Sequence, residues 1–279
     1  MSPRLSLVTG IPSATTPRVA LVTGASSGIG RAVATALAER GYRVLGTSRD
    51  PSRLTDTPRG VEFLPLDLAD EASVEACAAA AGAVDVLVNN AGESQSGPFE
   101  ELPMDAVERL FRINVFGAVR LTQLLLPGMR ERNYGRVVMV GSMLASFPLA
   151  YRSSYVASKA ALKGFAHAAR REVDPWGVAI TTVEPGSINT GISERRTRYV
   201  AEDSPHRVRF RRMLAALDRN EAKGISAERV AATVVKAIEV PRPKPLYAVG
   251  SNAPVVFALR RIASRSTVEK RVARKHGLR

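Results

Sequence analysis

The chain has 279 residues, of which 45% are apolar and 24% charged, values that exclude the disordered and fibrous classes. Its single cysteine, Cys77, excludes a disulfide framework, three scattered histidines argue against a metal site, and no stretch reaches the roughly 20 uncharged apolar residues of a membrane span. The net charge is +14, and from Arg242 to the C-terminus there are ten Lys and Arg residues against one acid, Glu269. We therefore expect a cytoplasmic protein without metal and with one basic end.

From Val19 onward, short apolar runs alternate with longer helical patterns. The strand-like runs are 19–22, 42–47, 61–66, 84–88, 136–140, 178–183 and, more weakly, 246–249, and a helical stretch over 29–40 is ended by Gly41. Strands that alternate with helices of ten or more residues predict right-handed crossovers and a doubly wound parallel sheet. We therefore expect an α/β Rossmann fold of about seven strands in a single domain over 18–250, preceded by a flexible leader at 1–17.

Two segments fall outside this alternation. The arginine-rich segment 193–224 looks like an insertion over the carboxyl ends of the strands, where it would form a substrate lid. Residues 251–279 predict a basic helical extension, which could pack over the pocket mouth, form a subunit interface or lie on an anionic membrane. A solvated helix face is the plainest explanation of its charge, and specific nucleic-acid binding is not expected, because no aromatic stacking platform accompanies the arginines.

A glycine-rich turn, Thr23-Gly24-Ala25-Ser26-Ser27-Gly28-Ile29-Gly30, follows the first strand directly. Gly24 permits the tight turn, Gly28 lets the backbone approach a diphosphate, and Gly30 lets the helix pack close to the strand. Free N–H groups at the helix start would then face the anion. The turn favours a dinucleotide site, although many strand–helix turns use glycine for backbone reasons alone.

The residues after the second strand decide which dinucleotide is expected. A site for NAD would place Asp or Glu there, to accept hydrogen bonds from the ribose. This chain has Ser48 and Arg49, a hydroxyl donor and a planar cation suited to a 2′-phosphate, and Asp50 comes one position too late. NADP(H) is the favoured cofactor, and the alternative is that Arg49 is a surface arginine.

Tyr155 and Lys159 are four positions apart, so on a helix they would share one face. A tyrosine hydroxyl with a pKa near 10 is a poor base at neutral pH, and an adjacent ammonium would lower that pKa. The same phenol would protonate the alkoxide when a ketone is reduced, while Ser142, at the end of a strand, could hold the substrate oxygen. Taken alone, a pair at this spacing is more often two surface residues.

The ordered set of motifs resembles the short-chain dehydrogenase/reductase family. Over about 18–190 the chain carries the glycine-rich turn, Asn89-Asn90-Ala91-Gly92, Asn114, Ser142, Tyr155 and Lys159, and Pro185-Gly186, all in family order and with 13 positions from Ser142 to Tyr155. The resemblance implies that Tyr155 is the acid/base, Lys159 its activator and ribose anchor, Ser142 the partner of the substrate oxygen, and Asn114 the holder of a relay water. It also implies a homodimer or homotetramer, formed through the helices that carry Asn114 and Tyr155.

The resemblance further implies cofactor contacts along the strand ends. Beside Gly24, Gly28, Gly30, Ser48, Arg49, Tyr155 and Lys159, these are Ser26, Ser27, Ile29, Asp67, Leu68, Asn90, Ala91, Gly92, Pro185, Gly186, Ile188 and Thr190. Asp67 has an alternative structural role, as a cap of the helix that begins near Asp70.

Between Ser142 and Tyr155, where the family lines its substrate pocket, the chain carries Met143, Leu144, Phe147, Leu149 and Tyr151. We expect Leu144 and Phe147, with Ser142 and Tyr155, to contact a bulky hydrophobic substrate; a looser resemblance to 17-beta-hydroxysteroid and retinol dehydrogenases suggests a steroid- or retinoid-like one. The expected activity is hydride transfer between NADP(H) and a secondary alcohol/ketone pair. The alternatives are NAD-dependent alcohol oxidation and a dinucleotide sensor without turnover.

Overall fold

Seven parallel strands form the central sheet of the computed structural model, which describes residues 17–189, 191 and 194–278. Their spatial order is β3-β2-β1-β4-β6-β7-β9. They are β1 (Val19–Val22), β2 (Arg43–Ser48), β3 (Val61–Pro65), β4 (Val86–Asn89), β6 (Gly135–Val140), β7 (Val178–Pro185) and β9 (Leu246–Val249). The chain winds outward from β1 to β3, returns to β4 and winds outward the other way, so the predicted Rossmann-like α/β fold is confirmed.

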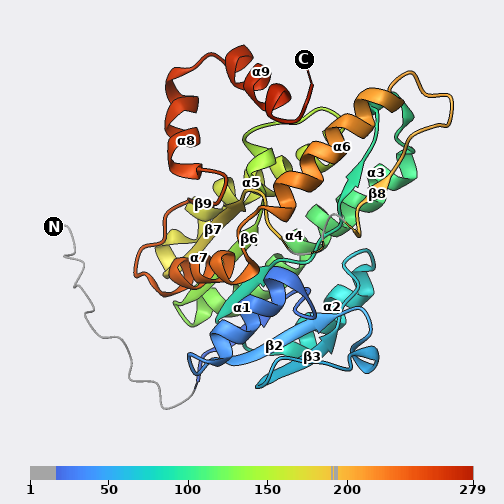
Figure 1. Cartoon of the computed structure of the whole chain (residues 1–279). Helices are drawn as coiled ribbons and strands as arrows, with labels where there is room; N and C mark the ends of the chain where they lie inside the picture. The colour runs from blue at the N-terminus through green and yellow to red at the C-terminus, as the bar shows by residue number, and fades with distance from the viewer. Residues whose placement is uncertain (1–16, 190, 192–193, 279) are drawn as a thin grey trace.

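Helices cover both faces of the sheet (Figure 1). On one face α1 and α7 pack through residues such as Leu37 and Val234, and on the other α2, α4 and α5 pack through residues such as Leu121 and Leu162. Because both faces are covered, the central strands appear in the sequence as continuous apolar runs. The helices are α1 (Gly28–Ala38), α2 (Glu71–Ala81), α3 (Met104–Phe111), α4 (Gly117–Glu131), α5 (Ser153–Val173), α6 (Arg207–Ala222), α7 (Ala227–Glu239), α8 (Ala253–Ile262) and α9 (Arg265–Lys275).

The strand ends differ from the predicted ones by one or two residues. β7 continues to Pro185, past the apolar run, because Glu184 and Pro185 pair with Ala248 and Val249 of β9. The carboxylate of Glu184 is fully buried and lies 2.8 Å from the Lys163 ammonium on α5. A buried ion pair therefore lets a charged residue belong to a central strand, which the hydropathy pattern could not show.

The two segments outside the strand–helix alternation are folded against the carboxyl ends of the strands. The expected lid contains β8 (Thr197–Arg198), which pairs with β5 (Gln95–Ser96), and the whole of α6. At the C-terminus, α8 and α9 follow β9 (Figure 1), and their apolar residues Val256 and Val268 pack near Phe147. Residues 1–16 of the expected leader and position 193 of the expected lid lie outside the described residues. Within the described ranges, no helix is both long enough and apolar enough to cross a bilayer.

A π-helical turn over Arg112–Phe116 (η3) joins α3 to α4. Such turns widen a helix locally and often occur at functional sites. Immediately after it, Gly117 lies so close to Leu68 that an added Cβ would be 2.4 Å from the Leu68 carbonyl oxygen. This close contact fixes the turn, and with it Asn114, against the segment that follows β3.

Candidate active site

A cleft of about 1080 Å³ lies at the carboxyl ends of the strands, the edge where doubly wound sheets bind ligands. Its walls come from the strand ends, the segment between β7 and α7, and helices α8 and α9. Nearly all of the site residues expected from the sequence line it. The exceptions are Gly30 and Asn114, which lie behind the wall, and Thr190, which is outside the described residues.

The glycine-rich turn has the backbone geometry that a phosphate cradle needs. Gly24 and Gly28 have positive φ angles of 66° and 55°, which favour glycine. A Cβ on Gly30 would lie 2.2 Å from the Gly24 carbonyl oxygen, so no other residue fits there. The first N–H groups of a helix have no acceptor within it, so the start of α1 is available to an anion. The Ser27 hydroxyl, at this start, accepts a hydrogen bond from Arg195 Nη1 at 2.9 Å.

The end of β2 presents the two residues expected to select the dinucleotide. Ser48 Oγ is buried and has no hydrogen-bond partner among the described residues, and exposed Arg49 lines the same wall. Asp50 turns to the next segment, where its carboxylate accepts from Ser52 N at 3.1 Å. The cleft thus combines a buried hydroxyl that has no hydrogen-bond partner with a turn whose close contacts only glycine allows. This arrangement suits a bound dinucleotide.

The ends of β3 and β4 supply further cofactor candidates. Asp67 and Leu68 line the cleft, and the Asp67 carboxylate accepts from Ala69 N at 2.9 Å. The cap of α2 is Asp70, whose side chain accepts from Ala72 N, so the alternative of Asp67 as helix cap is wrong. Asn90 Nδ2 donates to the Thr23 carbonyl at 2.9 Å and thereby ties the end of β4 to the glycine-rich turn.

The remaining candidates on this wall are the next residues of the family motif, Ala91 and Gly92. Both line the cleft. A Cβ on Gly92 would lie 2.8 Å from Asn114 Oδ1, so the backbone needs glycine there.

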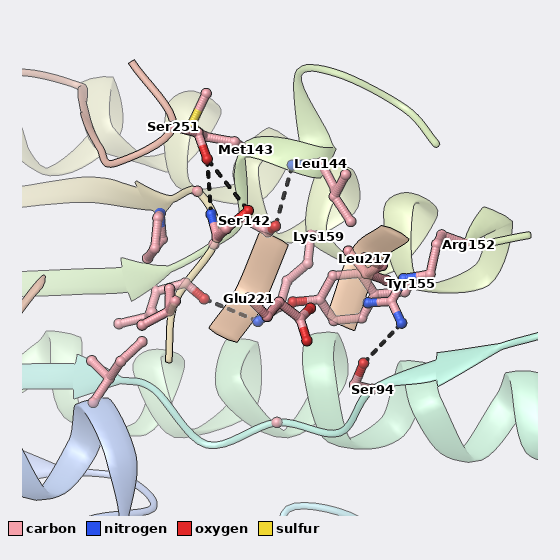
Figure 2. A pocket seen from close by; sticks show the side chains of 18 of the residues that line it. Ser94, Ser142, Met143, Leu144, Arg152, Tyr155, Lys159, Leu217, Glu221 and Ser251 are labelled. Carbon is pink, nitrogen blue, oxygen red and sulfur yellow. Dashed lines mark hydrogen bonds between the residues drawn. The ribbon is translucent and has the colours of Figure 1, made fainter. Parts of the chain in front are cut away.

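The three residues expected to act on the substrate lie together in the cleft (Figure 2). Tyr155 and Lys159 belong to α5, and Lys159 Nζ donates to the Val140 carbonyl at 3.0 Å. Ser142 follows β6 and starts a one-turn helix, where its Oγ accepts from Leu144 N at 3.2 Å. The structure therefore brings together a phenol, an ammonium and a hydroxyl around one space.

The pKa values of Tyr155 and Lys159 are both shifted toward the neutral form. Burial raises the pKa of the Tyr155 hydroxyl and lowers that of Lys159 to about 8, because a buried site disfavours the charged state. A lowered Tyr155 pKa was expected from the sequence, and that direction is wrong for this structure. The largest opposing effect comes from Arg152, whose guanidinium carbon lies 4.2 Å from the Tyr155 ring centroid.

Asn114 is buried beside the cleft and forms hydrogen bonds to two of the segments around it. Its Oδ1 accepts from Glu93 N at 2.8 Å, and its Nδ2 donates to the Glu93 carbonyl at 3.0 Å and to Ser158 Oγ at 3.2 Å. These bonds hold the segment after β4 against α5, which carries Tyr155. The expected role of Asn114 in holding a relay water stays a prediction.

The other end of the cleft holds the nicotinamide and substrate candidates. Pro185, Gly186 and Ile188 line the wall after β7. Leu144 and Phe147 line the cleft with Tyr155, and so do apolar residues of α8 and α9: Val255, Val256, Leu259, Val268 and Val272. Leu149 and Tyr151 instead pack with Phe210 of α6 in a separate apolar cluster. The lining therefore extends an apolar wall onto the C-terminal helices.

Three charged residues at this site were not predicted from the sequence: Arg152, Arg196 and Glu221. Arg152 lines the cleft and is 3% exposed. Glu221 of α6 lines it as well, and both of its oxygens lie 2.6 Å from Arg196 Nη2. Arg152 could have been found from its position three residues before Tyr155. Arg196 and Glu221, 25 positions apart, meet only through the fold.

One group of side chains has the spacing of a metal site among the described residues. Ligand atoms of Glu100, Glu101 and His206 lie within 4.8 Å of one another. His206 Nε2 is 2.7 Å from Glu100 Oε1, and Glu101 accepts from Ala201 N at 2.9 Å. These bonds tie the segment before α6 to the one before α3, which is a sufficient structural role.

Comparisons with known proteins agree with this geometry. The family model described as short chain dehydrogenase matches residues 18–200. A 3-ketodihydrosphingosine reductase of Bacteroides thetaiotaomicron is 32% identical over 264 residues, which cover 92% of each chain. A short-chain dehydrogenase from Streptomyces avermitilis superposes with a TM-score of 0.80 and 34% identity, over 94% of this chain and 98% of its own. One from Burkholderia cenocepacia, solved in complex with NADP, gives a TM-score of 0.74 and 27% identity over 92% and 97%. The chain therefore belongs to the short-chain dehydrogenase/reductase family, oxidoreductases that use a nicotinamide dinucleotide.

Proposed function

We propose that this protein is an NADPH-dependent reductase of bulky, hydrophobic ketones. The observation that carries the proposal is one continuous cleft that joins a glycine cradle and Arg49 at one end to Tyr155, Ser142 and an apolar wall at the other. The unpartnered Ser48 hydroxyl beside Arg49 supports recognition of a 2′-phosphate. The NADP bound to the Burkholderia cenocepacia relative supports the same choice.

In this proposal a bound nicotinamide supplies the hydride that reaches the carbonyl carbon. Tyr155 gives its hydroxyl proton to the carbonyl oxygen, and the Ser142 hydroxyl donates a hydrogen bond to the same oxygen. Lys159, held by the Val140 carbonyl, places a positive charge next to the phenol and can return a proton, since its pKa is about 8. The apolar side chains over the cleft keep water from the reacting atoms.

The apolar wall defines the proposed substrate class. The ring of Phe147 packs edge-on against the ring of Phe257 of α8, with 5.1 Å between the ring centroids. Val256 and Val268 pack in the same apolar cluster. A long chain or fused ring system would bury apolar area there. The Bacteroides thetaiotaomicron relative carries 3-ketodihydrosphingosine in its name, and we extend to this chain only the features of a ketone on a large apolar body. A steroid- or retinoid-like ketone also has these features.

The cofactor assignment is tested by fluorescence titration of the protein with NADPH and, separately, with NADH. Arg49→Ala should weaken NADPH binding about ten- to hundredfold, because a charge-assisted hydrogen bond contributes about 1.5–3 kcal/mol. NADH binding should not change. Equal or tighter binding of NADH by the unaltered protein would overturn the role of Arg49 and favour NAD-dependent alcohol oxidation.

The catalytic assignment is tested with Tyr155→Phe. This variant should still bind NADPH and should lose ketone reduction by at least about a hundredfold, because general acid catalysis contributes 10²–10⁴-fold. A protein that senses the dinucleotide without turnover would show no reduction of any ketone in the unaltered form. Retention of the hydroxyl, ammonium and phenol together argues against such a sensor.

We also propose that the chain forms a homodimer or homotetramer through the helices that carry Asn114 and Tyr155. Both leave a phenylalanine exposed: Phe116 by 56% and Phe165 by 48%. Exposed aromatic side chains are enriched at interfaces. Light scattering should give a mass above one chain, and Phe165→Asp should reduce it.

Finally, we propose that α8 contacts anionic membranes. Val255, Leu259 and Ile262 are exposed by 60%, 40% and 83%, and Arg260 and Arg261 lie among them. Such a surface suits the interface of a bilayer and would bring the cleft close to a lipophilic substrate. The cytoplasmic location expected from the composition stays a prediction.

A further inference from the structure

Arg152 is a buried cation whose hydrogen bonds go to neutral groups. Its Nη1 donates to Ser94 Oγ, the Gln95 carbonyl and Ser96 Oγ at 2.9–3.0 Å. Its Nε is buried as well, with no partner in the described part of the chain. The acids that influence it from farther away, Glu221 and Asp218, are both hydrogen-bonded to Arg196. Burial of a charge without a bonded counter-ion is costly, so this position requires a reason.

The guanidinium of Arg152 lies against the ring of Tyr155. Its central carbon is 4.2 Å from the ring centroid, whereas Lys159 Nζ is 6.0 Å away and donates to the Val140 carbonyl. Figure 2 shows Arg152 beside the ring, with Lys159 and Glu221 toward the hydroxyl end. The face of an aromatic ring attracts cations, and ionisation of the phenol adds electron density to the ring. Arg152 is therefore the closer of these two cations to the ring of Tyr155.

We propose that Arg152 is a positioning residue for Tyr155, and that its fixed charge stabilises the phenolate formed during ketone reduction. As hydride adds to the carbonyl carbon, the C=O electron pair passes to the oxygen, which takes the Tyr155 proton. The phenol is left negative, and Arg152 keeps all its protons. This inference rests on the proposed function, in which Tyr155 is the acid.

The other charges that face Tyr155 do not replace this one. Arg196, from the lid, favours the phenolate, while Glu221 of α6 opposes it, and these two form an ion pair with each other. Lys159 has a pKa of about 8 and so loses charge as the pH rises. Burial also lowers the pKa of Arg152, but a guanidinium keeps its proton in proteins, so Arg152 stays cationic while the phenol titrates.

The test is a titration of the Tyr155 phenol by phenolate absorbance, isolated by subtracting the curve of Tyr155→Phe in each background. Arg152→Gln should raise the Tyr155 pKa by at least about one pH unit, because an opposite charge within 4–6 Å shifts a pKa by 1–3 units. Arg152→Lys, which keeps a charge, should raise it by less. Arg198→Gln is the matched control: it removes an arginine of β8 whose side chain is 52% exposed, and the phenol should titrate unchanged.

Two results would overturn the proposal: an unmoved Tyr155 pKa in Arg152→Gln, or equal shifts in Arg152→Gln and Arg152→Lys. If Arg152→Gln does not fold, Arg152→Met leaves no buried amide and serves in its place. The titration needs no turnover, so it separates the two proposals. A shifted Tyr155 pKa in a protein that reduces no ketone would overturn the proposed function alone. Ketone reduction by the unaltered protein, together with an unchanged Tyr155 pKa in Arg152→Gln, would overturn only the role of Arg152.

Discussion

At the scale of one residue, burial of the Lys159 ammonium destabilises the folded protein. Lys159 is 6% exposed, and burial lowers its pKa from 10.5 to about 8. Between these pH values the unfolded chain keeps the proton that the folded chain has released. Stability from this site therefore rises with pH across that window, and the buried ammonium costs about 3 kcal/mol below it.

Replacing this lysine should stabilise the protein while it disables the site. Lys159→Met is expected to raise the free energy of unfolding at pH 7 by about 2–3 kcal/mol, and the gain should shrink as the pH approaches 10.5. Denaturant unfolding at pH 7 and at pH 10 measures both values. Lys163→Met, on the same helix, is the matched control and should destabilise, because it leaves the buried Glu184 carboxylate unpaired. An equal gain at both pH values for Lys159→Met would contradict the burial argument.

At the scale of elements, the two parts of the lid, β8 and α6, are held to each other by one buried ion-pair cluster. β8 has two residues and pairs with β5, which also has two. Directly before β8, the fully buried side chain of Arg196 bonds Asp218 and Glu221 of α6. Removing one partner of a buried pair leaves the others uncompensated, at about 3–5 kcal/mol.

Arg196→Met should therefore loosen the lid, with a larger effect at the substrate end of the cleft than at the cofactor end. We expect KM for a ketone to rise at least about tenfold and NADPH affinity to fall by less, because the dinucleotide keeps its contacts with the glycine-rich turn and loses only those with the lid. Hydrogen exchange over 194–222 should quicken in parallel. The neighbour Arg198 is half exposed and 3.9 Å from Asp218, so Arg198→Met should change little. Similar effects of the two substitutions would show that the cluster does not hold the lid.

The elements that sequence could predict are those whose burial is uniform. The strands are covered on both faces, so their apolar runs were enough to predict the sheet, and the motifs at their ends predicted residues that line one cleft. The sequence did not predict the buried charges of Glu184, Arg152 and Glu221. Each of these side chains is buried together with a partner from a distant part of the chain, which no local pattern reveals. The direction of the Tyr155 pKa shift was not predicted either, because it depends on how deeply the fold buries the phenol.

At the scale of the whole molecule, the charge and the exposed apolar surface coincide. The C-terminal helices hold most of the basic residues counted from Arg242 onward, and α8 also exposes Ile262 by 83%. The same helices close one side of the cleft. The helices that line the cleft are thus also the ones that expose basic and apolar side chains together.

Binding to vesicles should follow this distribution. The protein is expected to sediment with phosphatidylglycerol vesicles, less with phosphatidylcholine, and progressively less as salt screens the attraction. Ile262→Asp should weaken binding severalfold by removing apolar contact. Val208→Asp alters a side chain of α6 that is 71% exposed, and should bind as the unaltered protein does. Equal sedimentation with both lipids would argue against an anionic membrane contact.

The hydrogen bond from Arg195 to Ser27 has a kinetic consequence. It joins the lid to the turn where a diphosphate would lie, although 168 positions separate the two residues. A dinucleotide that occupies the turn meets Arg195 there, and its phosphates offer a stronger acceptor than a serine hydroxyl. The lid is then fastened by the first ligand before the second arrives. We therefore expect a compulsory order, in which the dinucleotide enters first and leaves last.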